Sequence, residues 1–242
     1  MPKLEIYNLI LEVTRKCNMN CKHCLRGDTQ NIDMEMKTII PILEITEHIS
    51  SLVFSGGEPT LNIPLMYDVL HYVKKHDIPV DSFYIVTNGK VISDEFLKLL
   101  LEWYIYTIPH SPEPDMSGIA LSKDIFHEDI PYENELKLRA FSFFKEDKIT
   151  NWEEKQYSLI DQGRASKLSK TAYKIWTKPS SHQLYVDRTP NENFVIDDEI
   201  YISAKGEICG DCDLSYANMT KHAVGNTNDI ESFLDYLKTH AN

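Results

Sequence analysis

The stretch Ile6–Val13 reads IYNLILEV, and residues 17–24, which follow it closely, read CNMNCKHC. A short apolar run with β-branched members is typical of a buried strand in a parallel sheet. The three cysteines therefore fall in the loop that leaves the carboxyl end of this strand. Because ligands of α/β sheets bind at that end, we expect the cysteines to belong to a functional site.

Strands and helices alternate beyond this stretch. Apolar runs predict further strands at Ser51–Phe54, Ser82–Thr87 and Gly118–Ser122. Helical spacing of apolar residues predicts helices at Asp33–His48, Ile63–Lys75 and Asp94–Trp103. Pro41 interrupts the first helical pattern, and Ser93 is a candidate N-cap for the third helix. Repeated strand, loop and helix units predict a parallel sheet.

The second half of the chain has weaker patterns. We expect a helix at Tyr132–Phe141, a strand at Tyr157–Ile160 and a last helix at Asp229–Leu237. Glu199–Ser203 and Glu207–Cys209 predict a β-hairpin, because the residues between them, AKG, are typical of a tight turn.

Composition narrows the class of protein. The 242 residues carry 25 Lys and Arg against 37 Asp and Glu, a formal net charge of −12, and 42% are hydrophobic, as in ordinary globular proteins. No run of about 18 apolar residues predicts a membrane span, and the first residues do not resemble a secretory signal. We therefore expect a cytoplasmic protein that binds neither membrane nor duplex nucleic acid, since acidic surfaces repel phosphate backbones.

The five cysteines fall into a group of three and a pair. An odd number in a chain without a secretory signal argues against a disulfide framework. Cys17, Cys21 and Cys24 have the spacing C-x3-C-x2-C, and His23 or Asp28 could complete a zinc site with them. Alternatively, three thiolates suit a four-iron cluster whose fourth iron stays open to another ligand.

A second motif indicates which kind of site the three cysteines form. Gly56-Gly57-Glu58-Pro59 stands about 30 residues after the cysteines, at the end of the second predicted strand. With this motif, the cysteine loop resembles that of the radical SAM superfamily. The resemblance implies that Cys17, Cys21 and Cys24 hold a [4Fe–4S] cluster and that Gly56, Gly57, Glu58 and Pro59 contact the amino group of S-adenosylmethionine. Weaker similarities imply cofactor contacts from Asn88, Ser122 and Arg164, and His23 stands where the family usually has an aromatic residue near the adenine.

The resemblance also implies a fold and a domain division. We expect an α/β protein in which residues 1–190 form a partial (β/α)6 barrel. Residues 191–242 would form a small extension, a β-hairpin plus a helix, similar to a truncated SPASM or twitch extension. The pair Cys209 and Cys212 falls in this extension. It could bind no metal, bind zinc or a cluster with Asp211, Asp213, His222 or a second subunit, or donate a hydrogen atom to a substrate radical.

The function implied by the resemblance is reductive cleavage of S-adenosylmethionine to a 5′-deoxyadenosyl radical, which abstracts hydrogen from a substrate. Such extensions often accompany enzymes that modify a peptide or protein. Alternatives are a small-molecule substrate, a glycyl-radical-enzyme activase, a nucleotide-modifying enzyme and a non-enzymatic iron–sulfur scaffold or redox protein. The basic residues around the cysteines, Arg15, Lys16, Lys22 and Arg26, could form a docking surface for a flavodoxin- or ferredoxin-type reductant or be a solvated loop.

Overall fold

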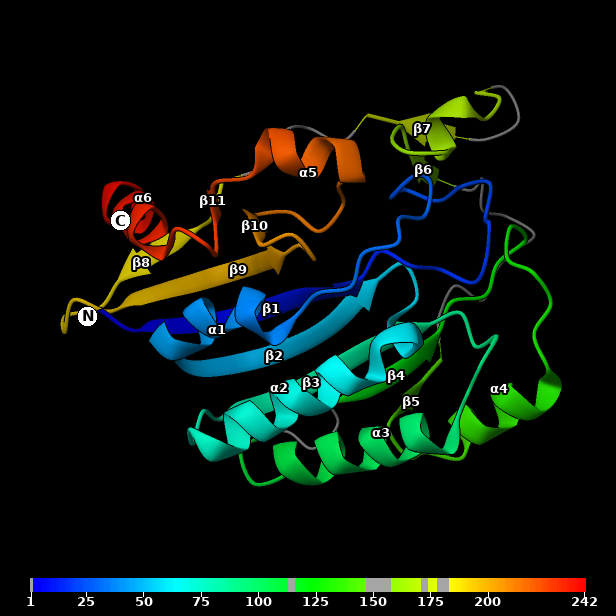
Figure 1. Ribbon diagram of the computed structural model, residues 1–242, viewed down its shortest axis with the longest axis horizontal. Coiled ribbons are helices and arrows are strands. Elements are labelled where there is room, and N and C mark those ends of the chain that lie inside the picture. Colours follow the sequence, from blue (N-terminus) through cyan, green and yellow to red (C-terminus); the bar gives the residue numbers. More distant parts are fainter. Residues whose placement is uncertain (1, 113–115, 147–157, 171–173, 178–182) are drawn as a thin grey trace.

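The computed structural model describes residues 2–112, 116–146, 158–170, 174–177 and 183–242 (Figure 1). Within these residues, one sheet of nine strands has the order β11-β10-β9-β1-β2-β3-β4-β5, with β8 paired to β9. Its strands are β1 Leu4–Thr14, β2 Thr46–Gly56, β3 Val80–Thr87, β4 Gly118–Leu121, β5 Phe144–Lys145, β8 Val186–Arg188, β9 Phe194–Ile202, β10 Glu207–Cys209 and β11 Gly225–Asn226.

The core of this sheet is parallel. Strands β1 to β5 pair in chain order, with Leu9 opposite Leu52 and Leu52 opposite Phe83. The predicted α/β class and partial barrel are therefore confirmed. The sixth parallel strand is β9, which pairs with the other edge of β1 and places Ile200 opposite Leu9.

The strand predicted at Tyr157–Ile160 lies outside the main sheet. Strand β6, Ser158–Ile160, pairs in parallel with β7, Lys174–Trp176, and the two form a separate small sheet. Figure 1 shows β6 and β7 apart from the main sheet. Tyr157 itself lies outside the described residues. This predicted strand is therefore not part of the parallel main sheet.

The predicted helices of the first half are present. They are α1 Met36–Ile45, α2 Ile63–Lys75, α3 Asp94–Thr107 and α4 Tyr132–Arg139, and the short 3-10 helix η1 spans Pro59–Asn62. Helix α1 continues through Pro41 but ends at Ile45, because β2 begins at Thr46, earlier than we predicted. The predicted cap of α3 is confirmed, since the Ser93 hydroxyl accepts a hydrogen bond from Phe96 N at 3.1 Å.

The two faces of β1 contact different cores. Leu9, Leu11 and Val13 belong to the large apolar core that the helices α1, α2 and α3 complete. Ile10 points to the opposite face, as the alternation of a strand requires. There it packs with residues of the C-terminal segment, including those of α5, Tyr216–His222. The second face therefore carries α5 and the loop before it, whereas the last helix, Ile230–His240, packs into the large core through Phe233 and Leu237.

The C-terminal segment contains the predicted hairpin and helix. Strands β9 and β10 pair antiparallel around a turn in which Gly206 has φ +82°, and α6 spans Ile230–His240. Because β9 also pairs with β1, the main sheet continues across residue 190. The domain division at that residue stays a prediction. No helix among the described residues is long and apolar enough to cross a membrane.

Candidate functional site

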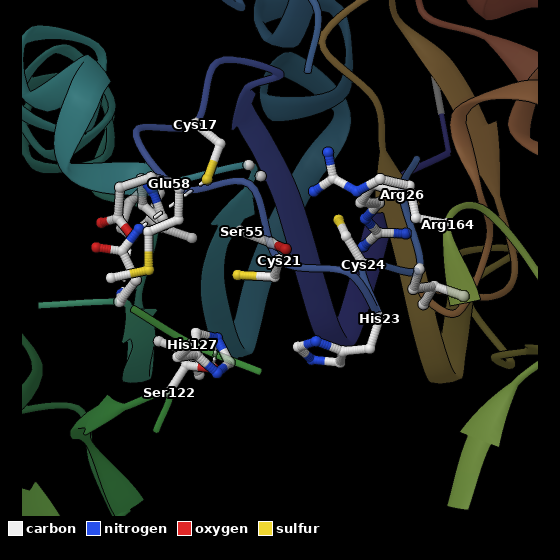
Figure 2. Close-up of a pocket in the computed structure, with 18 of the residues that line it drawn as sticks. Cys17, Cys21, His23, Cys24, Arg26, Ser55, Glu58, Ser122, His127 and Arg164 are labelled. Carbon is white, nitrogen blue, oxygen red and sulfur yellow. Dashed lines mark hydrogen bonds between the residues drawn. The ribbon is translucent and has the colours of Figure 1, made fainter. Parts of the chain in front are cut away.

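A cavity of about 500 Å³ opens at the carboxyl ends of the first four parallel strands (Figure 2). Such a volume is typical of a ligand site. Apart from Cys209 and Cys212, it brings together every predicted site residue, namely Cys17, Cys21, His23, Cys24, Gly56, Gly57, Glu58, Pro59, Asn88, Ser122 and Arg164. The roles of these residues toward a cofactor stay predictions, but the structure places them around one space.

The two glycines of the GGEP motif allow β2 to lie against the cysteine loop. A Cβ atom on Gly56 would lie 2.3 Å from Thr14 O, and one on Gly57 would lie 2.3 Å from Lys16 O. The backbone instead pairs there, since Gly57 N donates to Thr14 O at 2.8 Å and Glu58 N donates to Lys16 O at 2.9 Å. A side chain at either position would therefore separate the motif from the cysteine loop.

Glu58 joins the GGEP motif to the end of β3. Its carboxylate accepts hydrogen bonds from Thr60 N and Thr60 Oγ1, from Thr87 Oγ1 at 2.7 Å and from Asn88 N at 2.8 Å. Burial raises the pKa of Glu58, and these hydrogen bonds oppose that effect by stabilising the charged form. Glu58 thus holds the loops after β2 and β3 together at the wall of the cavity.

The cysteine loop is fixed near its first cysteine. Asn88 Nδ2 donates to Asn18 Oδ1 at 2.8 Å and lies 4.0 Å from Cys17 Sγ. Cys17 N donates to Thr29 Oγ1 at 3.1 Å. Burial raises the pKa of the Cys17 thiol, and burial together with Cys17 and Cys24 raises the pKa of Cys21 to about 11. The three thiols are free, so a metal that binds them as thiolates must displace their protons.

A second segment closes on the loop at Cys24. Arg164 N donates to Cys24 O at 2.9 Å, and Gly163, with φ +56°, approaches so closely that a Cβ there would lie 2.2 Å from Leu25 O. The Arg164 side chain is largely buried, hydrogen-bonds Asn20 Oδ1 and lies 3.6 Å from Asp28. Arg164 is therefore part of the cavity wall rather than a solvated arginine.

Two of the basic residues near the cysteines face the protein interior. Arg15 is buried between Glu12, at 2.7 Å, and Glu207 of β10, at 3.1 Å. Arg26 Nη1 donates to Cys212 O and Leu214 O, both at 2.5 Å, and its guanidinium lies 4.9 Å from the centre of the Tyr201 ring. Neither arginine can serve the exposed docking surface that their positions suggested. Instead, both attach the C-terminal segment to the cysteine loop.

The C-terminal cysteines lie outside the cavity lining. Cys209 is fully buried, and burial raises its pKa to about 12. Cys212 N donates to Glu199 Oε1 at 2.5 Å, and burial, followed by the charge of Glu199, raises the pKa of the Cys212 thiol. Glu199, Asp211 and Cys212 lie close enough to share an ion. The metal-binding and hydrogen-donor roles of the two cysteines stay predictions.

Sequence reasoning missed two polar residues beside His23. Asp124 and His127 follow β4, and Asp124 Oδ2 lies 3.2 Å from His23 Nε2. Phe126 stacks on the His23 ring at a centroid distance of 4.6 Å. The Asp-x-x-His spacing is visible in the sequence, but its proximity to His23 is not. Asp213, which we considered only as a ligand for the C-terminal cysteines, also lines the cavity.

The donor set fits an iron–sulfur cluster. Three free thiols from one loop line the same cavity, and three thiolate ligands leave one iron of a four-iron cluster for another ligand. Gly57 approaches Cys17 closely, since a Cβ added to Gly57 would lie 3.1 Å from the Cβ of Cys17. The second motif therefore lies directly beside the thiols. The cavity therefore has the ligands and the room that the cysteine spacing predicted.

Comparisons with known proteins agree with this arrangement. Residues 11–133, half of the chain, match the family model of the Radical SAM superfamily. The uncharacterized protein MJ0907 of Methanocaldococcus jannaschii is 29% identical over 99 residues, which cover 39% of this chain and 35% of that protein. The tungsten-containing aldehyde ferredoxin oxidoreductase cofactor-modifying protein of Pyrococcus furiosus is 34% identical over 100 residues, which cover 39% of this chain and 27% of that protein.

These matches span about a third or less of the two curated relatives. Among solved structures, native anSMEcpe with bound AdoMet and Cp18Cys peptide has a TM-score of 0.54 at 14% identity. That match covers 99% of this chain and 83% of the other chain. At this identity the likeness concerns the fold, and it extends through the C-terminal segment as well as the parallel strands.

Proposed function

Because this chain belongs to the radical SAM superfamily, we propose that its cavity holds a [4Fe–4S] cluster and S-adenosylmethionine and that the protein abstracts hydrogen from a peptide or protein. The observation that carries the proposal is the meeting of Cys17, Cys21 and Cys24 with residues 56–59 in one cavity. The three thiolates would hold three irons and leave the fourth open. When bound, the two groups supply reductive cleavage of the sulfonium C–S bond and hydrogen abstraction from carbon.

The residues of the chain orient and shield this chemistry. Glu58, Thr87 and Asn88 lock the ends of β2 and β3 to each other, which fixes the wall beside Cys17. Met19 and Val53 are apolar residues of the lining, and Met19 is almost fully buried. An apolar wall keeps water from a reactive species and strengthens the electrostatic interactions inside the cavity.

A groove on the same face of the sheet supports a peptide substrate. It holds about 290 Å³, and Val53 lines both the groove and the cavity. Most of its other lining residues are polar, and they include Asn8, Ser51, Ser82 and Tyr84 beside the apolar Met116. Asn8 Oδ1 is buried and has no hydrogen-bond partner among the described residues, so it could accept a hydrogen bond from a substrate N–H only after its side chain moves into the groove. The fold shared with anSMEcpe, solved with the Cp18Cys peptide, is consistent with this substrate class.

A small molecule is the second candidate substrate. The Pyrococcus furiosus relative, the more similar in sequence of the two described above, is named as a cofactor-modifying protein. The groove could also hold such a molecule, since its volume is near the range typical of small-molecule sites. For either substrate, we expect a flavodoxin- or ferredoxin-type protein to supply the electron. Of the four basic residues near the cysteines, Lys22 is exposed and could contact such a protein.

Anaerobic reconstitution with iron and sulfide, followed by dithionite and S-adenosylmethionine, tests the proposal. We expect about four irons per chain and formation of 5′-deoxyadenosine. Cys24→Ala should lose both, whereas Cys209→Ala, which removes a thiol outside the cavity, should keep its iron. A reduced, iron-loaded protein that forms no 5′-deoxyadenosine would show that the proposal is wrong.

The substrate class needs a separate measurement. We expect a panel of peptides to raise the rate of 5′-deoxyadenosine formation and one of them to change in mass. Ser82→Trp should reduce this stimulation, because the indole would fill the groove, while the slow formation of 5′-deoxyadenosine without peptide continues. If only small-molecule extracts raise the rate of 5′-deoxyadenosine formation, the peptide substrate is refuted and the small-molecule substrate is favoured.

A further inference from the structure

A cluster of three metal-binding side chains lies at one end of the cavity. His23 Nε2 is 3.2 Å from Asp124 Oδ2, and His127 Nδ1 is 2.8 Å from Asp124 Oδ1. One ligand atom from each of the three residues lies within 4.8 Å of the others. Figure 2 shows the His23 ring directed toward His127 and Ser122, on the side of the cavity away from Arg26.

Neighbouring groups orient two of the three side chains, His127 and Asp124. The Ser122 hydroxyl pairs with His127 Nε2 at 3.1 Å, which leaves His127 Nδ1 facing Asp124. Asp124 Oδ1 accepts a hydrogen bond from Phe126 N at 2.7 Å. A partner that holds the second ring nitrogen, or the carboxylate of a ligand, is typical of metal centres because it sets the direction of the donor atom.

The charge of Asp124 suits a cation. Burial alone would raise its pKa, but the close approach of the His127 and His23 rings outweighs that effect and lowers it. The carboxylate is therefore ionised at neutral pH. Two imidazole nitrogens and one carboxylate oxygen form a donor set that suits Zn²⁺ and Fe²⁺ among the common divalent ions.

We propose that His23, Asp124 and His127 bind one divalent transition-metal ion, separate from the three-cysteine site. Ligands about 2.1 Å from a tetrahedral ion lie roughly 3.4 Å apart, so the observed separations need only small side-chain movements. Three protein ligands leave a fourth position, and because His23 and His127 line the cavity, that position can accept a carbonyl or carboxylate oxygen from a molecule in it.

The site is compatible with a cofactor that stacks on His23. A metal binds a ring nitrogen in the plane of the imidazole, and Phe126 covers one face of the ring. The His127 ring contacts His23 in a T-shaped arrangement at a centroid distance of 5.3 Å, and His23 also lines the cavity. An ion at the edge of the ring would therefore not occupy the space that a stacked cofactor needs.

Zinc binding by the cluster-loaded protein tests the proposal. The reconstituted protein is dialysed against Zn²⁺, and zinc and iron per chain are measured together. We expect about one zinc in addition to an unchanged iron content, with Zn–N/O distances of about 2.0–2.1 Å and no Zn–S distance of about 2.3 Å by X-ray absorption. Asp124→Asn and His127→Ala should each weaken zinc binding by about 100-fold or more, since each removes one of three ligands.

Two controls separate this site from others. His48→Gln removes a comparable His–Asp pair, 2.9 Å from Asp81 and outside the cavity, and Glu199→Gln disrupts the second group that could hold an ion. Both should keep the zinc. Three results would each overturn the proposal. The wild-type protein could retain no zinc, the zinc could have sulfur ligands, or Asp124→Asn could leave the affinity for zinc unchanged. Because iron content and 5′-deoxyadenosine report on the cysteine site, failure of the zinc site and failure of the proposed function are distinguishable.

Discussion

Replacing Arg26 should detach the C-terminal segment from the cysteine loop. Arg26 Nη1 donates to the carbonyls of Cys212 and Leu214, both at 2.5 Å, and the guanidinium lies over the Tyr201 ring. In Arg26→Met, a side chain of similar length leaves both carbonyl groups without this donor. The perturbation therefore tests whether this contact, rather than chain connectivity, holds the segment in place.

The contacts that Arg26 makes determine how much its replacement should lower the free energy of unfolding. Each partly buried carbonyl that loses its donor costs about 1–2 kcal/mol, and the lost cation–π contact costs about 1–2 kcal/mol. Removal of the charge also removes the penalty of burying it, which offsets part of this loss. We expect a net decrease of about 2–4 kcal/mol in the free energy of unfolding. With a urea m-value near 3 kcal/mol/M, the unfolding midpoint falls by about 1 M.

Arg188→Met is the matched control. Arg188 also donates to a carbonyl, Lys238 O at 3.2 Å, and lies 5.6 Å from the centre of the Phe194 ring, but its side chain is 37% exposed. We expect its loss to cost about 1 kcal/mol or less. Urea unfolding followed by circular dichroism measures both variants. Equal midpoints for Arg26→Met and Arg188→Met would refute the reasoning.

Three further predictions concern the cavity and the C-terminal cysteines. Gly57→Ala should lose most of its iron after reconstitution, because its Cβ would meet Lys16 O at 2.3 Å, whereas Gly225→Ala, whose Cβ would lie 3.1 Å from the Phe233 ring and far in sequence from the cysteine loop, should keep it; equal iron in both would contradict this. In the metal-free protein, alkylation of Cys21 at pH 8 should be about 100-fold slower than that of an unperturbed thiol, because its pKa is raised to about 11. Mass spectrometry should show the rate rising with pH toward 11 and the difference vanishing in urea, and a rate independent of pH between 8 and 10 would count against the shift. The double variant C209A/C212A should keep the iron content of wild type, since neither thiol lines the cavity, and a loss of iron would show that the pair binds metal.

Local patterns predicted the parallel strands, the helices and the cap at Ser93, because periodicity and capping depend on residues close in sequence. The same holds for the three cysteines and the GGEP motif, which the strand ends bring together. The position of β9 was not predictable in this way. Its pairing with β1 is set by contacts between residues 190 positions apart, such as Leu4 with Phe194.

The buried arginines show the same limit. The sequence places Arg15 and Arg26 beside the cysteines, where basic residues ordinarily face water. Their burial depends on Glu207 and Tyr201, which belong to the C-terminal hairpin. Likewise, His23 meets Asp124 and His127 only after β1 and β4 have taken their places in the sheet. Contacts between residues so far apart in sequence therefore could not be predicted from the sequence and were found only in the structure.

The pairing of β1 with β9 has a consequence for how the protein is made. On the ribosome, β1 leaves the exit tunnel with one neighbour soon to follow, but its second neighbour is synthesised about 10–40 s later at ordinary translation rates. During that interval one edge of the central strand offers unpaired backbone groups, which other nascent chains could join. We therefore expect the growing chain, more than the finished protein, to need a chaperone.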